Sequence, residues 1–243
     1  MEEQYSHSYR ILCRSCLQPT DWCYCKNIQP LDVGMRFAIL QHPLERRRRI
    51  ATGRMAYLSV QGSYMIHGYD FNDDPHIHAL LQNPLYQPVV LYPEPPSFNL
   101  DVLSLHEKRQ LILDGKKLLI FVIDGTWATA KKTILRSQNL CQLPRIFFQP
   151  RQQSRFRIRK QPTKDCFSTI EAVHQCIDLL GEACGFDLQD RRHDALLTTF
   201  DHFVEAHVQH KEMLKKTGMG LSPRRVEKKH IEGEKVCSNK MKK

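Results

Sequence analysis

A run of six apolar residues, Leu118 to Ile123, places the strongest constraint on the fold of this 243-residue chain. Its length and its unbroken apolar character predict a strand buried on both faces, as in the centre of a parallel sheet. Asp124, Gly125 and Thr126 follow directly. Because ligands of open α/β sheets bind beyond the carboxyl ends of the strands, Asp124 stands where a site is expected.

Two interpretations of Asp124 remain open from this pattern. In one, its carboxylate acts on a ligand, Gly125 permits close approach of the backbone, and Thr126 caps a helix whose amides point toward the ligand. In the other, Asp124 only precedes the helix that begins near Trp127. An aromatic side chain after a strand end can stack on a nucleobase or pack into the core. For Trp127, packing into the core is the favoured interpretation.

Strands and helices alternate along the rest of the chain, which predicts an α/β domain. Ser168-Thr169-Ile170-Glu171 forms a capping box that opens one helix, and Gly185 is its expected end. The other predicted strands cover 36–41, 89–91 and 145–148, and the other predicted helices cover 50–61, 102–113 and 196–207.

Four of the nine cysteines, Cys13, Cys16, Cys23 and Cys25, lie within thirteen residues. Four thiolates at C-x-x-C and C-x-C spacing are a tetrahedral ligand set for Zn²⁺, so residues 1–30 are predicted to be a small zinc-binding unit. The alternative is four unconnected thiols. The odd cysteine count and the polar N-terminus, with no export signal, argue against a disulfide framework.

The formal charge of +10 is unevenly distributed. Residues 211–243 hold 11 basic and 4 acidic residues, and this segment is expected to be a basic, disordered tail. Two clusters lie in the body: Arg46, Arg47, Arg48 and Arg49, and then Arg151, Arg155, Arg157, Arg159 and Lys160 in an acid-free stretch. Such clusters predict a nucleic-acid partner, with a solvated basic face as the alternative.

No apolar run approaches the ~20 residues that span a bilayer, so no membrane association is predicted and the cytoplasm is the expected location. No obligate protein partner is evident.

Asp124-Gly125-Thr126-Trp127 resembles the D-x-T-W signature of the DTW-domain family. Other marks of that family occur in order over about residues 10–210. They are the C-x-x-C…C-x-C cluster, His42-Pro43-x-Glu45, Thr52-Gly53-Arg54, Leu91-Tyr92-Pro93, Leu143-Pro144, Ser154-x-Phe156-x-Ile158-Arg159-Lys160 and Ser168-Thr169-Ile170-Glu171-Ala172. The chain departs from the pattern at Ala51, where Asn is expected, and at Phe156, where Tyr is usual.

The resemblance implies a SPOUT-like α/β domain over 31–210 with a parallel, knotted sheet. It implies a tRNA-uridine aminocarboxypropyltransferase that moves the 3-amino-3-carboxypropyl group of S-adenosylmethionine to uridine N3 and releases methylthioadenosine. A SPOUT-type methyltransferase and a non-catalytic zinc-containing RNA-binding module are the alternatives. A variable-loop uridine is the first expectation for the target.

The resemblance also implies roles for individual residues. Asp124 is the expected general base for the N3 proton, or else binds the cationic amino group or orients uracil. The two arginine clusters with Lys160 are expected to hold tRNA, and the zinc is expected to be structural. The expected cofactor-binding residues are Leu91, Tyr92, Pro93, Asp124, Gly125, Thr126, Trp127, Leu143, Pro144, Ser168 and Thr169.

Freshly purified protein is expected to contain about one equivalent of zinc, because four thiolates complete its coordination. Metal analysis before and after dialysis against a chelator measures this. A content below roughly half an equivalent would contradict a structural zinc site.

Overall fold

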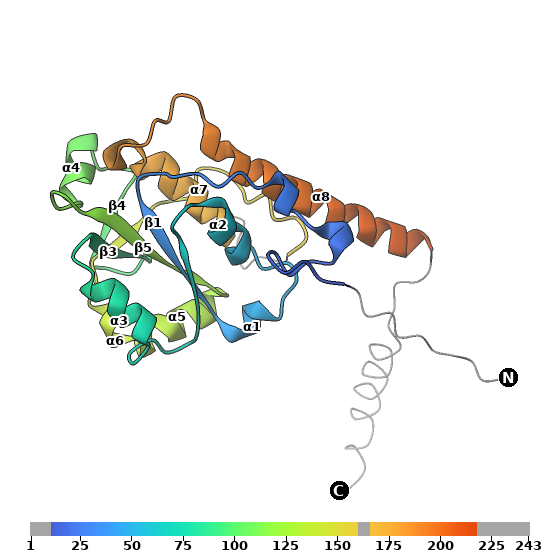
Figure 1. Cartoon of the computed structure of the whole chain (residues 1–243), viewed down its shortest axis with the longest axis horizontal. Helices are drawn as coiled ribbons and strands as arrows, with labels where there is room; N and C mark the ends of the chain where they lie inside the picture. Colours follow the sequence, from blue (N-terminus) through green and yellow to red (C-terminus); the bar gives the residue numbers. More distant parts are fainter. Residues whose placement is uncertain (1–10, 160–165, 218–243) are drawn as a thin grey trace, which may run out of the picture.

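The computed structural model describes residues 11–159 and 166–217, and within them the chain forms a six-stranded parallel sheet (Figure 1). The strand order is β2-β1-β5-β3-β6-β4, and all neighbouring strands of this sheet pair in parallel. The strands are β1 (Arg36–Gln41), β2 (Tyr64–His67), β3 (Tyr86–Leu91), β4 (Ser97–Asn99), β5 (Lys117–Asp124) and β6 (Arg145–Phe147).

Strand β5 contains the apolar run and lies between β1 and β3. Its side chains alternate between two hydrophobic clusters, so that Ile120 belongs to one and Phe121 to the other, both 0% exposed. A strand with helices on both sides needs apolar side chains at every position, since neither face meets water. The prediction of a central strand buried on both faces is confirmed.

Two layers of helices cover the sheet (Figure 1). Helices α2, α7 and α8 pack on the face that contains Ile120, and α3, α5 and α6 pack on the face that contains Phe121. None of the helices in the described ranges is long and apolar enough to cross a membrane. The helices are α1 (Pro43–Arg46), α2 (Gly53–Ser59), α3 (Pro75–Gln82), α4 (Leu105–Gln110), α5 (Trp127–Arg136), α6 (Gln138–Cys141), α7 (Thr169–Leu180) and α8 (Ala195–Lys216).

The α/β class is therefore confirmed, whereas the knot stays a prediction. The two edge strands, β2 and β4, have no counterpart among the predicted strands, because both are short and neither is a continuous apolar run. Helix α7 ends at Leu180 and not near Gly185. Gly185 instead takes a left-handed conformation after the 3₁₀ turn Glu182–Cys184.

The last helix extends further than predicted. Helix α8 continues through residues 211–216, which were expected to be disordered, and Lys215 and Lys216 lie in its last turn. Cations at a helix C-terminus interact favourably with the helix dipole, which supports this extension. Residues 1–10, 160–165 and 218–243, including Lys160, lie outside the described residues.

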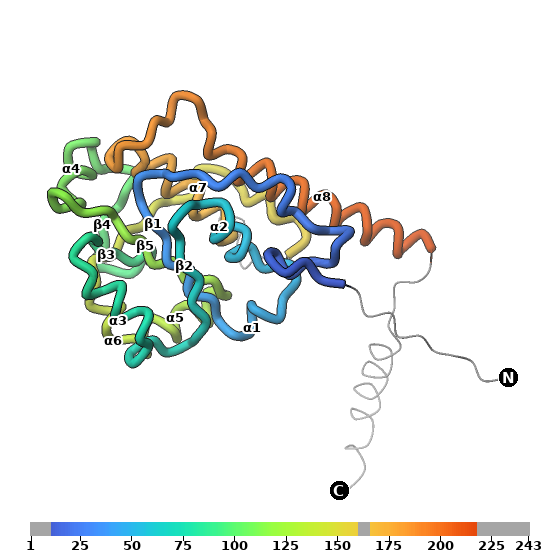
Figure 2. Tube along the Cα trace, in the orientation of Figure 1, coloured from blue at the N-terminus to red at the C-terminus, as the bar shows by residue number. Residues whose placement is uncertain are grey.

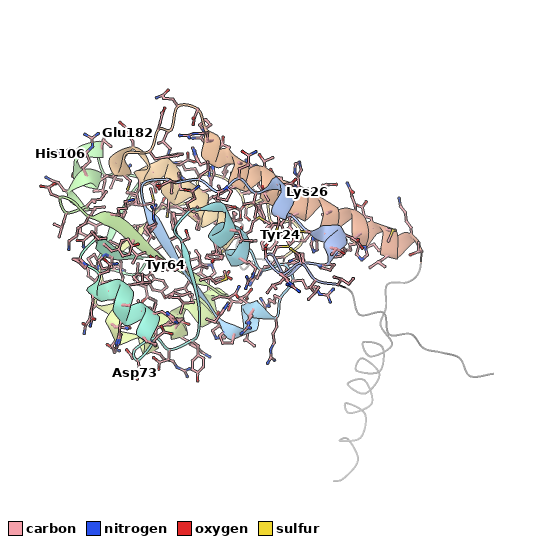
Figure 3. All side chains as sticks on the ribbon, in the orientation of Figure 1. Tyr24, Lys26, Tyr64, Asp73, His106 and Glu182 are labelled. Carbon is pink, nitrogen blue, oxygen red and sulfur yellow. The ribbon has the colours of Figure 1, made fainter. Side chains whose placement is uncertain are left out.

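The N-terminal segment runs alongside α8 (Figure 2). The ring of Trp22 lies 4.5 Å from His207 and 4.6 Å from His210, centroid to centroid. Tyr24, labelled in Figure 3, is 4% exposed and packs edge-on against Phe203 at 5.6 Å. The predicted zinc-binding unit thus shares one hydrophobic core with the sheet.

Replacement of Phe121 by Ala is expected to lower the free energy of unfolding by about 3–5 kcal/mol, because it leaves a cavity beneath the centre of the sheet. Urea denaturation measures the change. Val102→Ala is the control, since Val102 is 75% exposed and its truncation is expected to change stability by less than about 0.5 kcal/mol. An equal effect of the two substitutions would contradict the assignment of Phe121 to the core.

Candidate functional site

A cavity of about 800 Å³ lies at the carboxyl ends of β3, β5 and β6. Leu91, Ile123 and Phe147 bring these strand ends to its wall, and the first turns of α5 and α7 also line it. This is the edge of an open α/β sheet at which ligands bind, so the cavity lies at the edge where the sequence predicted a site.

Eight of the eleven expected cofactor-binding residues line this cavity. They are Leu91, Tyr92, Pro93, Gly125, Thr126, Trp127, Ser168 and Thr169. Leu143 and Pro144 do not line it. Leu143 packs against the hydrophobic cluster of Phe121, and the carbonyl of Pro144 accepts a hydrogen bond from the amide of Val90 at 2.9 Å. Both residues precede β6, so they lie at its amino-terminal end, whereas the cavity lies at its carboxyl end.

Asp124 lies beside the cavity without lining it, and it is 2% exposed. Gln41 donates from Nε2 to Oδ2 of Asp124 at 2.9 Å, and Thr169 donates from Oγ1 to Oδ1 at 2.6 Å. Gly53 at the start of α2 is so close that a β-carbon there would meet Oδ2 at 2.4 Å. The carboxylate therefore joins the ends of β1 and β5 to the first residues of α2 and α7.

Burial raises the pKa of Asp124, and the hydrogen bonds from Thr169 and Gln41 act against that shift. A raised pKa suits a proton acceptor near neutral pH. The placement also suits a different task, because Asp124 holds Thr169 at the cavity wall. The general-base role of Asp124 stays a prediction.

Glu171 connects the start of α7 to the chain segment 154–159. It is 5% exposed, and its carboxylate accepts hydrogen bonds from Ser168 N at 2.8 Å and Ser168 Oγ at 2.6 Å, which confirms the capping box. The same carboxylate accepts from Ser154 Oγ and from the amide of Arg155, each at 2.7 Å. Sequence reasoning identified only the cap, because the second pair of donors comes from a distant segment.

The arginines of segment 151–159 all have acidic partners from elsewhere in the fold. Arg151 pairs with Asp101 at 3.2 Å, Arg155 with Asp201 at 2.7 Å, Arg157 with Glu205 at 3.0 Å, and Arg159 with Glu45 at 2.9 Å. The segment itself contains no acidic residue, but the fold brings acidic side chains from other segments into contact with its arginines. Binding of tRNA by these arginines stays a prediction, and it now requires phosphates to compete with these carboxylates.

Three arginines of the two clusters, Arg48, Arg49 and Arg159, line the cavity. Arg46 and Arg47 are exposed and form no ion pair within residues 11–159 and 166–217. The consecutive arginines thus divide between the cavity and the outer surface.

Trp127 is 51% exposed and lines the cavity, so the expectation that it packs into the core is wrong. Its Nε1 donates to Sγ of Cys166 at 2.9 Å, which orients the ring. It is the first residue of α5, beyond the end of β5, and there its side chain lines the cavity instead of the core beneath the helix. Phe156 is 3% exposed and packs against Phe200, so this departure from the usual Tyr is accommodated in the core.

The four N-terminal cysteines form a group that can hold a metal ion, with all Sγ atoms within 4.8 Å of one another. Sγ of Cys13 lies 3.8 Å from that of Cys25, and Sγ of Cys16 lies 3.6 Å from that of Cys23. Tetrahedral coordination with a Zn–S bond of about 2.3 Å requires sulfur separations of roughly 3.8 Å. The residues present therefore fit zinc.

The cysteine unit also holds the arginine loop. Gln18 donates from Nε2 to the carbonyl oxygen of Arg49 at 2.5 Å, and Arg54 donates to the carbonyl of Ser15 at 3.3 Å. Since Arg49 lines the cavity, the hydrogen bond from Gln18 links the cysteine unit to the cavity wall.

Comparison with known proteins shows which family shares these features. The DTW domain profile matches residues 10–208 of the chain. The tRNA-uridine aminocarboxypropyltransferase 2 of Drosophila melanogaster is 32% identical over 173 residues, which cover 69% of this chain and 66% of that protein. The protein of the same name from Macaca fascicularis is 24% identical over 95% of this chain and 77% of its own length.

A further relative is the tRNA-uridine aminocarboxypropyltransferase A of Arabidopsis thaliana, 25% identical over 72% of this chain and 75% of its own length. No solved structure matches the chain.

The substitution Asp124→Asn is expected to raise stability at pH 8 and to have less effect as the pH falls. Because the folded-state pKa of Asp124 is raised, the carboxyl group contributes stability that is fully present below its unfolded pKa. That contribution is lost as the pH rises through the folded pKa. At a pH above both values, the substitution is expected to add about 1.4 kcal/mol of stability for each unit by which the folded-state pKa of Asp124 exceeds its unfolded-state pKa. Asparagine keeps both hydrogen bonds if the amide of Gln41 rotates.

Thermal unfolding at several pH values measures this difference. Asp32→Asn is the control of opposite sign, because the hydrogen bond from Arg36 lowers the pKa of Asp32. Its replacement is expected to cost stability at neutral pH, and less as the pH falls through the pKa of Asp32. A D124N variant that loses stability with rising pH relative to wild type would contradict the buried, raised-pKa description.

Proposed function

Because this chain belongs to the DTW domain family, we propose that it transfers the 3-amino-3-carboxypropyl group of S-adenosylmethionine to N3 of a tRNA uridine and releases methylthioadenosine. The single observation that carries the proposal is the cavity at the strand ends. Its walls are mostly apolar and aromatic, and its charged lining residues within the described ranges are three arginines and no acid.

The dimensions and chemistry of the cavity suit this donor. Its volume of about 800 Å³ lies within the roughly 300–1,000 Å³ of small-molecule sites. The rings of Tyr92, Phe147 and Phe148 offer apolar surface for an adenine. The residues directly after β3 and β5 also line the cavity, and backbone N–H and C=O groups at such a place can fix the orientation of a nucleoside.

Trp127 is our candidate for the contact with the target uracil. It is half exposed at the cavity wall, and RNA-binding proteins commonly stack unpaired bases on aromatic side chains. Arg46 and Arg47, exposed next to the cavity-lining arginines, are the candidates for contacts with tRNA phosphates. Electrostatic binding of this kind weakens as the salt concentration rises.

We assign Asp124 one of two roles in the transfer. As a general base it would accept the N3 proton of uracil. As a positioning residue it would hold Thr169 and the start of α7 at the cavity wall, through the 2.6 Å hydrogen bond. The second role needs no motion of the carboxylate from its buried place.

The four cysteines are proposed to hold a structural zinc ion. Four thiolates leave no open coordination position, so the ion would have no catalytic role. Its effect on the transfer would be indirect, through the bond from Gln18 that holds the backbone of Arg49. We further propose that the sheet of residues 31–210 has the knotted SPOUT-like topology and that the protein acts in the cytoplasm.

Incubation of unmodified tRNA with the protein and S-adenosylmethionine, followed by nucleoside mass spectrometry, tests the proposal. The expected product is uridine enlarged by one aminocarboxypropyl group. D124A is expected to abolish transfer, and D124N to lower the rate about 10²–10⁴-fold if Asp124 is the general base. D32N is expected to leave the rate unchanged. Uridine enlarged by a methyl group, or no product and no binding of S-adenosylmethionine, would overturn the proposed function.

A further inference from the structure

We infer that Arg48 and Arg159, held in place by the buried Glu45, bind the carboxylate of the aminocarboxypropyl chain. Glu45 is then a positioning residue for the transferred group. The inference rests on the proposed function, and it gives two residues from the expected tRNA-binding clusters a different ligand.

Glu45 binds both arginines from behind the cavity wall. It lies on α1, is 1% exposed and does not line the cavity. Arg159 donates from Nη2 to Oε1 of Glu45 at 2.9 Å and from Nη1 to Oε2 at 3.1 Å, so the two side chains form a bidentate salt bridge. Arg48 donates from Nη1 to the same Oε1 at 2.7 Å. Both arginines line the cavity.

This arrangement leaves positive charge facing the cavity. One carboxylate is shared by two guanidinium groups, so the three side chains carry a net charge of +1. Each guanidinium keeps N–H groups that Glu45 does not use, because an arginine has five. A buried charge needs a partner of opposite sign. Glu45 is that partner for Arg48 and Arg159, but its one negative charge does not neutralise both arginines. The cavity therefore has a preformed place for one anionic group.

The position of Arg159 favours a small carboxylate over an RNA phosphate. Its side chain is only 21% exposed, compared with 66% for Arg151 and 63% for Arg157 on the same segment. Segment 154–159 is fixed at both ends by buried glutamates, since Glu171 binds Ser154 and Glu45 binds Arg159. A guanidinium so enclosed and so fixed can meet a ligand inside the cavity but offers little surface to a polynucleotide backbone.

Anchoring of this carboxylate would determine which carbon of the sulfonium reacts. In the transfer, uridine N3 forms a bond to the γ-carbon, and the bond between that carbon and sulfur breaks. The electron pair stays on sulfur in neutral methylthioadenosine, and the N3 proton passes to a base. Since the carboxylate is attached to the chain that moves, holding it fixes the γ-carbon in line with N3, which a methyl transfer would not need.

The test compares the affinities of S-adenosylmethionine and methylthioadenosine for the full-length protein by calorimetry. Methylthioadenosine lacks the amino-acid portion and so cannot contact this anchor. Arg159→Gln is expected to weaken S-adenosylmethionine binding at least tenfold and to leave methylthioadenosine binding unchanged. Glu45→Gln is expected to act in the same direction more weakly, and R159K to retain part of the affinity. Arg36→Gln is the matched control, because Arg36 is 13% exposed and pairs with Asp32 outside the cavity.

Unchanged binding of S-adenosylmethionine by a folded R159Q variant would overturn the inference and leave the proposed function standing. An equal loss for both ligands would also overturn it, because it would show a general disturbance of the cavity. Weaker tRNA binding with an unchanged ratio of the two small-molecule affinities would assign Arg159 to phosphate. Failure of the wild-type chain to bind S-adenosylmethionine would overturn the proposed function itself.

Discussion

The buried carboxylate of Asp124 joins four parts of the chain that are far apart in sequence. It accepts hydrogen bonds from Gln41 at the end of β1 and from Thr169 at the start of α7, and Gly53 of α2 packs against it. These contacts hold the end of β1 and the start of α2 against the end of β5 and the start of α7, and the last two line the cavity. Burial of a carboxylate costs free energy unless the group is hydrogen-bonded. The fold therefore has to keep both donors, Gln41 and Thr169, in place beside Asp124. The shape of the site depends on this mutual constraint.

Two further buried carboxylates extend the same arrangement. Glu171 binds Ser154 and the amide of Arg155, and Glu45 binds Arg159 and Arg48. Segment 154–159 contains no regular helix or strand, yet it forms part of the cavity wall. Its conformation comes from these side-chain contacts rather than from a hydrogen-bonded ladder. The part of the cavity wall without regular structure is thus stabilised by the buried carboxylates of Glu171 and Glu45. The ends of the strands form another part of the wall.

The fold pairs the arginines of segment 151–159 with acidic residues that are distant in sequence. In sequence the arginines of 151–159 form an acid-free track, but Asp101, Asp201, Glu205 and Glu45 each come to one of them in the fold. Exposed pairs of this kind contribute little stability, and a phosphate can exchange with the carboxylate. The pair of Arg159 and Glu45 differs because it is enclosed. Burial thus distinguishes Arg159, which lines the cavity, from the arginines of the same segment that lie on the surface.

The sequence by itself determined the central strand, the capping box of α7, the cysteine cluster and the family resemblance. Each of these depends on neighbours within a few residues or on spacing along the chain, and such local patterns survive without knowledge of the fold. Only the tertiary structure decided that Leu143 and Pro144 lie away from the cavity wall, that Trp127 is exposed at the cavity and that Glu45 binds two arginines from behind that wall. The contact between Glu45 and Arg159 spans 114 positions. Nothing local in the sequence encodes such a pairing, because it arises when parallel strands and their helices bring distant carboxylates and guanidinium groups to one edge of the sheet.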